Sequence, residues 1–388
     1  MKLTQPPFRA AASVRFLTDN KPLGLYLHIP FCQKKCAYCD FYSAFAGEEQ
    51  LNGYTKGLIS QIKNWGGRLC RPLVDTVYFG GGTPSLLGER IIPVMQAVKE
   101  SFCVADGGEI TLEINPAGNS EKVLSAAKKA GVNRLSVGAQ SGNDEMLSAL
   151  GRTHSAQDTL STVKAARELG YNNISLDLMI GLPGSDLTTL KADLDFVLSA
   201  KPDHISAYIL KLEENTLFYK RRDTLNLPDE DETAEQYLYM CRYLEEKGFS
   251  HYEISNFARE GKEGKHNLKY WHCNEYLGIG PSAHSFLEGE RFYYPRDSRS
   301  FLRGESPVSD GKGGGEEEYI MLALRLKEGL CFKEYRERFC KDLPDSIKKA
   351  ALPLKKAVLL NINDESISLT DRGMLLSNSI ITNLLENL

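Results

Sequence analysis

Apolar and polar positions along the first half of the chain alternate between short apolar runs and longer amphipathic stretches. Six runs rich in aliphatic, β-branched or aromatic residues predict strands at 23–29, 74–80, 109–114, 134–139, 174–180 and 204–210. The intervening stretches have helical spacing, as in Leu160, Val163 and Ala166 before a stop at Gly170. This alternation predicts an α/β fold with a parallel sheet, either an open doubly wound sheet or a partial barrel.

Polar residues that could carry chemistry follow the ends of these predicted strands. Three cysteines follow the first strand, and "GGGTPS" (80–85) follows the second. Glu113 and Asn115 end the third, Gln140 ends the fourth, and "DLMIGLPG" (177–184) belongs to the fifth. Because strand C-termini carry the functional loops in such folds, we expect these segments to lie together.

The pattern changes after about residue 213. Residues 213–250 are charged and rich in tyrosine, 251–300 are rich in glycine and aromatic residues, and "SDGKGGGEEE" (309–318) has a linker's composition. The final segment predicts helices near 317–328, 333–340, 346–361 and 371–386, with a strand at 366–370. We therefore divide the chain into an arm (1–20), a barrel (21–212), an extension (213–308) and a domain resembling a winged helix (309–388).

Composition excludes several classes of protein. The 388 residues, 42% hydrophobic and 25% charged, can bury a full core. A net charge of −4 provides no overall attraction for nucleic acid or anionic membranes. Nine cysteines in so long a chain favour a reducing cytoplasm, and no apolar run approaches the length of a transmembrane helix.

The three clustered cysteines are Cys32, Cys36 and Cys39, spaced C-x3-C-x2-C. Three thiolates from one loop can bind three irons of a [4Fe–4S] cluster and leave the fourth iron for an exchangeable ligand. A structural zinc site ordinarily needs four nitrogen or sulfur ligands, and no second ligand pair stands nearby. Zinc and three thiols without a ligand are the alternatives to the cluster, which we favour.

The glycine run offers a close approach to the backbone. Gly80, Gly81 and Gly82 carry no side chains, Thr83 adds a hydroxyl group, and Pro84 restricts the turn. The run does not match a dinucleotide-binding fingerprint, which would need a further glycine. We expect it to lie against a ligand, and a simple turn at the end of a strand is the alternative.

The cysteine spacing after a strand, with Tyr38 just before the third cysteine, resembles the radical S-adenosylmethionine superfamily. The resemblance implies that S-adenosylmethionine binds the open iron, that the reduced cluster cleaves it to a 5′-deoxyadenosyl radical, and that the fold is a partial (β/α)6 barrel. A zinc-stabilised interaction module is the alternative from another class of protein.

Further motifs are similar to the coproporphyrinogen-dehydrogenase-like group of this superfamily. They include "YLHIPFC" (26–32), "LEINP" (112–116) and "RLSVGAQS" (134–141), and the resemblance spans nearly the whole chain. It implies that the cluster-bound S-adenosylmethionine contacts Tyr26, Gly81 and Glu113. The positions that match a second S-adenosylmethionine are Tyr38, Gly82, Thr83, Gln140, Arg152 and Asp177.

Two branches of this group compete. The oxygen-independent coproporphyrinogen III oxidase, a dehydrogenase, has the pattern CxxxCxxCxC, whereas this chain has Phe41 at the last cysteine and only 31 residues before Cys32. The HemW family of heme chaperones has an HNxxYW motif, which "HNLKYW" (266–271) matches. The resemblance to HemW implies heme and an unidentified heme-acceptor protein as partners, no nucleic acid, and at most peripheral membrane contact through the acceptor.

Within the HNxxYW motif, an imidazole and two aromatic rings suit a macrocycle. His266 could ligate heme iron, while Tyr270 and Trp271 would present flat apolar faces. His272 and Cys273 are the neighbouring rival ligands. Alternatively, His266 and Asn267 hydrogen-bond a loop while the aromatic residues fill the core.

Overall fold

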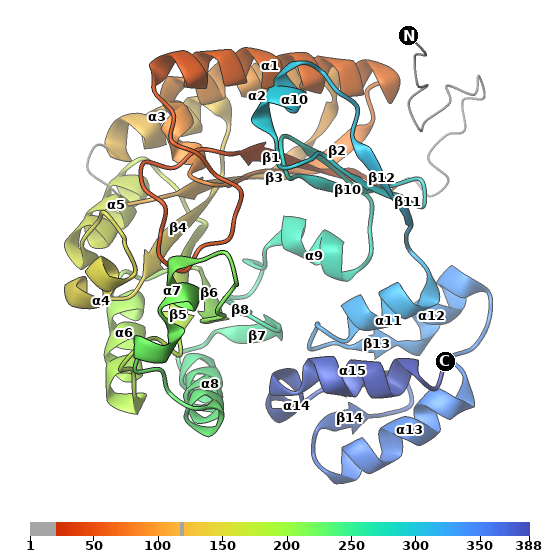
Figure 1. The fold of residues 1–388 in the computed structure, drawn as a ribbon. Coiled ribbons are helices and arrows are strands. Elements are labelled where there is room, and N and C mark those ends of the chain that lie inside the picture. Colours follow the sequence, from red (N-terminus) through yellow and green to blue (C-terminus); the bar gives the residue numbers. More distant parts are fainter. Residues whose placement is uncertain (1–20, 117–119) are drawn as a thin grey trace. The chain divides into compact units, whose positions relative to one another are not determined.

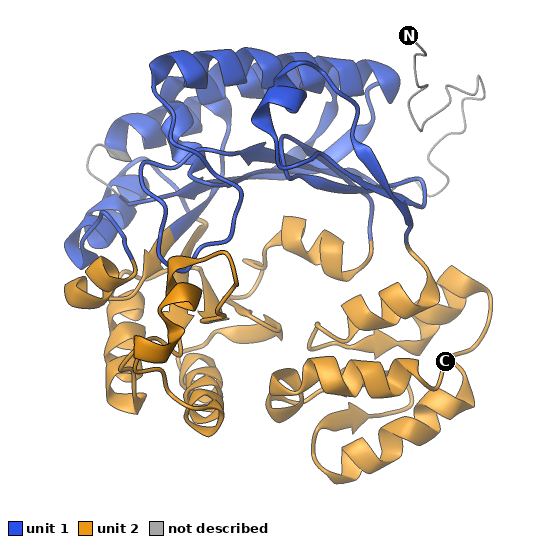
Figure 2. Cartoon of the chain, viewed as in Figure 1, with its two compact units in different colours: residues 1–137, 151–172, 274–313 blue, residues 138–150, 173–273, 314–388 orange. Residues whose placement is uncertain are grey.

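The computed structural model describes residues 21–116 and 120–388, so the predicted arm (1–20) lies outside the described residues. The chain forms two compact units and passes between them several times (Figure 2). Unit 1 contains the described residues up to 137 together with 151–172 and 274–313, and unit 2 contains 138–150, 173–273 and 314–388.

The described part of unit 1 is built on one sheet. Its strands are β1 (Leu23–Ile29), β2 (Leu73–Gly81), β3 (Cys103–Ile114), β4 (Arg134–Gln140, ending in unit 2), β9 (Tyr276–Ile279), β10 (His284–Leu287), β11 (Glu290–Tyr293) and β12 (Val308–Lys312). Their order is β12-β11-β10-β9-β1-β2-β3-β4. Strands β1 to β4 and β9 pair in parallel, whereas β10, β11 and β12 add an antiparallel edge.

Helices cover this sheet along one side (Figure 1). The helical segments of unit 1 are α1 (Glu48–Arg68), the 3-10 helix η1 (Pro84–Arg90), α2 (Ile91–Ser101), α3 (Ser120–Ala130), α5 (Ala156–Glu168) and α10 (Ser298–Leu302). Helix α1 packs on α2, α2 on α3, and α3 on α5. At the start of α5, Ser155 Oγ accepts the N–H of Asp158 at 3.2 Å, and the positive φ of Gly170 ends the helix as predicted.

One face of the unit 1 sheet is apolar at its centre. Leu25, Leu27 and Ile29 of β1 are fully buried, and so is Phe79 of β2. Side chains two residues apart in a strand share a face, and the opposite face of β1 carries Tyr26 and His28. This apolar centre supports the strand ends where the polar residues stand.

Unit 2 continues the β/α order and adds a short antiparallel edge. Its strands are β5 (Ile174–Ile180), β6 (His204–Ile209), β7 (Ser250–Glu253) and β8 (Asn256–Ala258), in the order β5-β6-β8-β7. Its first helical segments are α4 (Asp144–Ala149), α6 (Leu187–Ser199), α7 (Leu217–Lys220), the 3-10 helix η2 (Arg222–Thr224), α8 (Glu230–Glu246) and α9 (Lys265–Trp271). Asp229 caps α8 by accepting the N–H of Glu232 at 2.8 Å.

The C-terminal part of unit 2 has the helix-and-wing order that the sequence predicted. Its helices are α11 (Glu316–Ala323), α12 (Phe332–Phe339), α13 (Asp345–Lys356), α14 (Asp371–Leu375) and α15 (Ser377–Leu385). Strands β13 (Leu330–Cys331), β14 (Leu360–Ile362) and β15 (Ser366–Leu369) form an antiparallel sheet in the order β13-β15-β14. Helix α14 packs on α8, and α11 packs on α9.

The predicted α/β class is confirmed, with differences in detail. The six predicted strands appear as β1 to β6, and helices follow β1 to β5 in chain order. The predicted terminal helix is interrupted at Leu376. The linker was predicted to begin at residue 309, but the first residues of that segment belong to β12. Strand β12 is fully exposed and is held by pairing with β11, so no apolar alternation marked it in the sequence.

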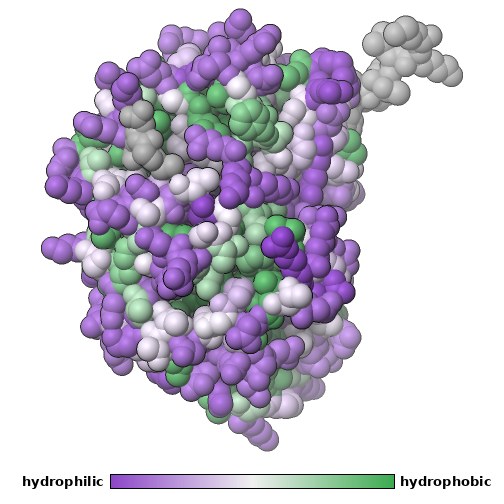
Figure 3. Space-filling view, turned by 60° about the vertical axis from the view of Figure 1, so that its left-hand side comes forward, coloured by the Kyte–Doolittle hydropathy of each residue, from purple (hydrophilic) through white to green (hydrophobic). Residues whose placement is uncertain are grey.

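Hydrophilic residues cover most of the face shown in Figure 3, and apolar residues gather in smaller patches between them. None of the described helices is both long enough and apolar enough to cross a membrane.

Candidate functional site

The three clustered cysteines lie in the loop between β1 and α1, which is anchored at both ends. Cys32 N–H donates to the carbonyl of Ala44 at 3.0 Å, and Ala44 N–H donates to the carbonyl of Pro30 at 2.9 Å. Cys39 N–H donates to the carbonyl of Cys36 at 3.3 Å, which closes a tight turn between these two thiols. Burial raises the pKa of Cys39, and the nearby Cys36 and Cys32 sulfurs raise it further.

Two side chains from other parts of the fold donate hydrogen bonds to this loop's sulfurs. Thr83 Oγ1, just after β2, lies 3.5 Å from Cys32 Sγ, and Arg152 Nη1, between α4 and α5, lies 3.7 Å from Cys36 Sγ. Donors directed at sulfur stabilise thiolates, the form that binds iron. Three thiols from one loop with such donors fit a cluster that keeps one iron open.

The loop thiols do not converge on the position of a single ion. In the described residues, one group of His, Cys, Asp and Glu has its ligand atoms within 4.8 Å of one another, namely Cys241, His251 and Asp371 of unit 2. Lys327 Nζ is already hydrogen-bonded to Asp371 there, and His251 Nδ1 lies 3.1 Å from the same oxygen. This group therefore works as a charged hydrogen-bond network that attaches α14 to β7.

The glycine run makes its close contacts within the protein. Gly81 has a φ of +115°, and a Cβ there would lie 2.6 Å from the ring of His28. A Cβ on Gly82 would lie 2.6 Å from the carbonyl of Phe31. The N–H of Gly82 donates to Ile29 at 2.8 Å, and that of Thr83 donates to Phe31 at 2.7 Å. The sequence predicted that a ligand would lie against these glycines. In the structure, the start of the cysteine loop lies against them instead.

A hydrogen-bonded cluster joins the ends of β1, β2 and β3. The Glu113 carboxylate accepts the Tyr78 hydroxyl at 2.9 Å and the Gly81 N–H at 3.1 Å. Tyr26 stacks on Tyr78 with ring centroids 6.1 Å apart, and its hydroxyl lies 3.0 Å from His28 Nδ1. The structure thus brings Tyr26, Gly81 and Glu113 together, and their contact with S-adenosylmethionine stays a prediction.

Sequence reasoning missed His28 and Tyr78, which complete this cluster. Burial lowers the pKa of His28 to about 4, so its imidazole is neutral at physiological pH. Both residues lie within largely apolar strands. In the sequence, only the glycines that they pack against could have indicated that these two side chains belong to the site. In the structure, Gly80 lies between the rings of Tyr26 and Tyr78.

Tyr38 lies in the cysteine loop of unit 1, beside Arg152, whereas Gln140 and Asp177 belong to unit 2. Gln140, at the end of β4, is 9% exposed with a φ of +66°, and Asp177 is half-buried within β5. The loop after β4 is held by Asp193, whose carboxylate accepts the Ser141 hydroxyl at 2.9 Å. That Gln140 and Asp177 converge with the cysteine loop stays a prediction.

Residues of the HNxxYW motif form α9 and are held by buried partners. His266 is 1% exposed, and its Nε2 lies 2.8 Å from the Tyr270 hydroxyl, one helical turn away. Trp271 is hydrogen-bonded to Glu253 of β7. His272 follows the helix with a side chain that is 33% exposed and a ring nitrogen 3.5 Å from Glu328, whereas Cys273 is buried.

The partner of Trp271, Glu253, leads to a testable pH dependence. Burial raises the pKa of Glu253 to about 7 from 4.5, and the side chain is 1% exposed. Between these pH values the folded protein retains a proton that the unfolded chain has lost, so stability falls as pH rises from 4.5 to 7. The cost reaches on the order of 3 kcal/mol above pH 7, at about 1.4 kcal/mol per pKa unit.

We expect Glu253→Gln, which mimics the protonated carboxyl, to be more stable than the unchanged protein at pH 8 and equally stable at pH 4. Denaturant unfolding across this pH range measures the difference. Glu246→Gln, at an exposed position at the end of α8, is the matched control. If the difference in free energy of unfolding between Glu253→Gln and the unchanged protein stayed constant with pH, the raised pKa of Glu253 would be contradicted.

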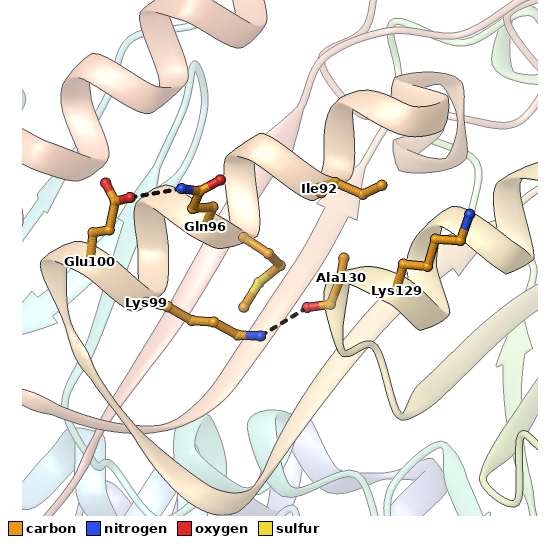
Figure 4. Close-up of a pocket in the computed structure, with 7 residues that line it drawn as sticks. Ile92, Gln96, Lys99, Glu100, Lys129 and Ala130 are labelled. Atoms are coloured by element: carbon orange, nitrogen blue, oxygen red, sulfur yellow. Dashed lines mark hydrogen bonds between the residues drawn. The ribbon is translucent and has the colours of Figure 1, made fainter.

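A separate depression lies between α2 and α3 (Figure 4). It has a volume of about 330 Å³ and contains none of the predicted site residues. Lys99 Nζ crosses it to donate to the carbonyl of Ala130 at 3.3 Å, and Gln96 donates to Glu100 at 3.0 Å. The Lys99 hydrogen bond connects α2 to the end of α3, whereas the bond between Gln96 and Glu100 lies within α2.

Comparisons with known proteins find relatives that match most of the chain. Residues 26–197 match the family model of the radical SAM superfamily, and residues 317–376 match that of the HemN C-terminal domain. The heme chaperone HemW of Lactococcus lactis is 33% identical over 93% of this chain and 97% of its own length. The heme chaperone HemW of Bacillus subtilis is 34% identical over 92% of this chain and 97% of its length.

A likeness in structure extends over most of the chain as well. The radical SAM enzyme coproporphyrinogen III oxidase (HemN) of Escherichia coli superposes with a TM-score of 0.81 over 94% of this chain and 90% of its own. Its sequence identity is 23%, so this likeness concerns the fold alone.

Proposed function

This chain belongs to the HemW family of the radical SAM superfamily, and we propose that it binds heme and delivers it to an acceptor protein. The observation that carries the proposal is the likeness to heme chaperones over more than nine-tenths of the chain. The HNxxYW motif of that family is also intact, as helix α9. The acceptor is an unidentified protein, and the reducing cytoplasm is the proposed compartment.

The proposed cofactors are a [4Fe–4S] cluster held by Cys32, Cys36 and Cys39, and S-adenosylmethionine. When bound and reduced, the cluster supplies the electron that cleaves S-adenosylmethionine. Glu113 is suited to S-adenosylmethionine because its carboxylate can accept hydrogen bonds from polar groups of the cofactor while Gly81 and Tyr78 orient it. Tyr26 would enclose the cofactor from β1.

A second S-adenosylmethionine is proposed at the six matching positions, Tyr38, Gly82, Thr83, Gln140, Arg152 and Asp177. Two of these residues, Thr83 and Arg152, donate to cluster cysteines in the structure. Their contacts support a role at the cluster itself.

The heme is proposed to bind at α9, with His266 Nε2 as the iron ligand. That nitrogen is hydrogen-bonded to the Tyr270 hydroxyl, so iron would have to displace this hydroxyl group in order to bind the imidazole. Since His266 is 1% exposed, binding requires α9 to open locally. Apolar burial of the macrocycle against Tyr270 and Trp271 would supply most of the affinity.

A heme titration of four proteins tests this proposal. We expect His266→Ala to lower heme affinity about tenfold or more and to shift the Soret band, because the axial ligand is lost. Tyr270→Phe is expected to retain the ligand and bind heme faster, because His266 Nε2 is then free. His272→Ala, which removes the more exposed neighbouring imidazole, is the matched control and should bind as the unchanged protein does.

Other outcomes would redirect or end the proposal. Loss of affinity in His272→Ala alone would move the ligand to His272. Failure of the unchanged protein to bind heme would overturn the chaperone function. The oxidase remains a relative in fold only, and Phe41, at the position of its extra cysteine, is 66% exposed.

A further inference from the structure

The loop between α4 and α5 packs directly on the cysteine loop. Gly151 has a φ of +79°, and a Cβ there would lie 3.4 Å from the backbone nitrogen of Ala37 and 3.6 Å from Cys36 Cα. The positive φ favours glycine, and the two loops are in ordinary van der Waals contact at this point. The next residue, Arg152, therefore extends its side chain along the cysteine loop.

The guanidinium group of Arg152 reaches one cysteine and two neutral partners. Nη1 donates to Cys36 Sγ at 3.7 Å, and Nη2 donates to Asn115 Oδ1 at the end of β3. The Tyr38 side chain, between Cys36 and Cys39, is hydrogen-bonded to the same guanidinium. Asn115 and Tyr38 hold the planar group without contributing an opposite charge, so these contacts direct its positive charge toward sulfur.

We propose that Arg152 is a positioning residue of the iron–sulfur site, which holds the Cys36 thiolate and makes the bound cluster easier to reduce. The inference rests on the proposed cluster at Cys32, Cys36 and Cys39. Hydrogen bonds to ligand sulfurs and nearby positive charge both favour the reduced, more negative cluster and thereby raise its reduction potential. Because Arg152 belongs to a different loop, its hydrogen bond to Cys36 also keeps that cysteine oriented when iron binds.

The test is a redox titration of the reconstituted protein without S-adenosylmethionine, followed by electron paramagnetic resonance of the reduced cluster. We expect Arg152→Gln to retain the iron and sulfide content of the unchanged protein and to be about tenfold harder to reduce, a shift of about 59 mV to more negative potential for one electron. Arg152→Lys keeps the charge but loses the planar fork, so its potential should lie between the two.

The matched control is Arg90→Gln, which removes a guanidinium of the same unit that pairs with Glu48. It should leave the potential unchanged. If Arg152→Gln loses the cluster, an intermediate potential in Arg152→Lys still supports the inference. The inference is overturned if Arg152→Gln has an unchanged reduction potential. If Arg152→Gln holds no cluster, an unchanged potential in Arg152→Lys overturns the inference instead. Absence of a cluster from the unchanged protein instead overturns the proposed function, which separates the two failures.

Discussion

Alanine at Cys32, Cys36 or Cys39, one position at a time, is expected to remove most of the protein's iron and sulfide, roughly nine-tenths or more. A cluster held by three protein thiolates has no spare ligand, because each one binds a different iron. The loop offers no replacement, since Cys32 and Ala44 are tied by backbone hydrogen bonds and the turn from Cys36 to Cys39 is closed. Iron and sulfide analysis with visible spectroscopy after anaerobic reconstitution measures the loss.

Two exposed cysteines of unit 1 provide matched controls for this experiment. Cys70→Ala and Cys103→Ala remove thiols that lie outside the cysteine loop, and both variants should keep the full iron content. If all three loop variants also kept full iron and colour, the assignment of the cluster ligands would be wrong. Bound zinc in place of iron would favour the interaction module.

Glu113→Ala is expected to weaken binding of S-adenosylmethionine to the reconstituted protein by about 10- to 100-fold, which corresponds to roughly 1.5 to 3 kcal/mol for a hydrogen bond to a charged group. The carboxylate is held by Gly81 N–H and the Tyr78 hydroxyl, so it is oriented before the cofactor arrives. Equilibrium binding to protein of equal iron content measures the loss.

Two milder substitutions separate the charge of Glu113 from its orientation. Glu113→Gln keeps an acceptor for Gly81 N–H but removes the negative charge, so most of the loss should persist. Tyr78→Phe removes one of the two orienting bonds and should weaken binding only a few-fold, about the worth of one neutral hydrogen bond. Full affinity in Glu113→Ala would remove this residue from the cofactor site.

Local patterns of the sequence determined the β/α order and led to the proposed cluster ligands. The runs at 23–29 and 174–180 became β1 and β5 at those limits, because aliphatic residues at every second position mark the buried face of each strand. Cys32, Cys36 and Cys39 could be proposed together from the sequence because a loop of eight residues brings its thiols together in almost any fold. The same locality made the helix stop at Gly170 predictable.

Tertiary structure alone decided which distant side chains meet. Arg152 and Cys36 are separated by 116 residues, and Glu113 and Gly81 by 32, so strand register and loop packing set their contacts. His266 shows the same limit, since the motif indicated a heme ligand but not that its side chain is buried with Nε2 hydrogen-bonded to the Tyr270 hydroxyl. Hydrophobic periodicity specifies which faces are buried, whereas a hydrogen-bond partner depends on positions that only the folded chain defines.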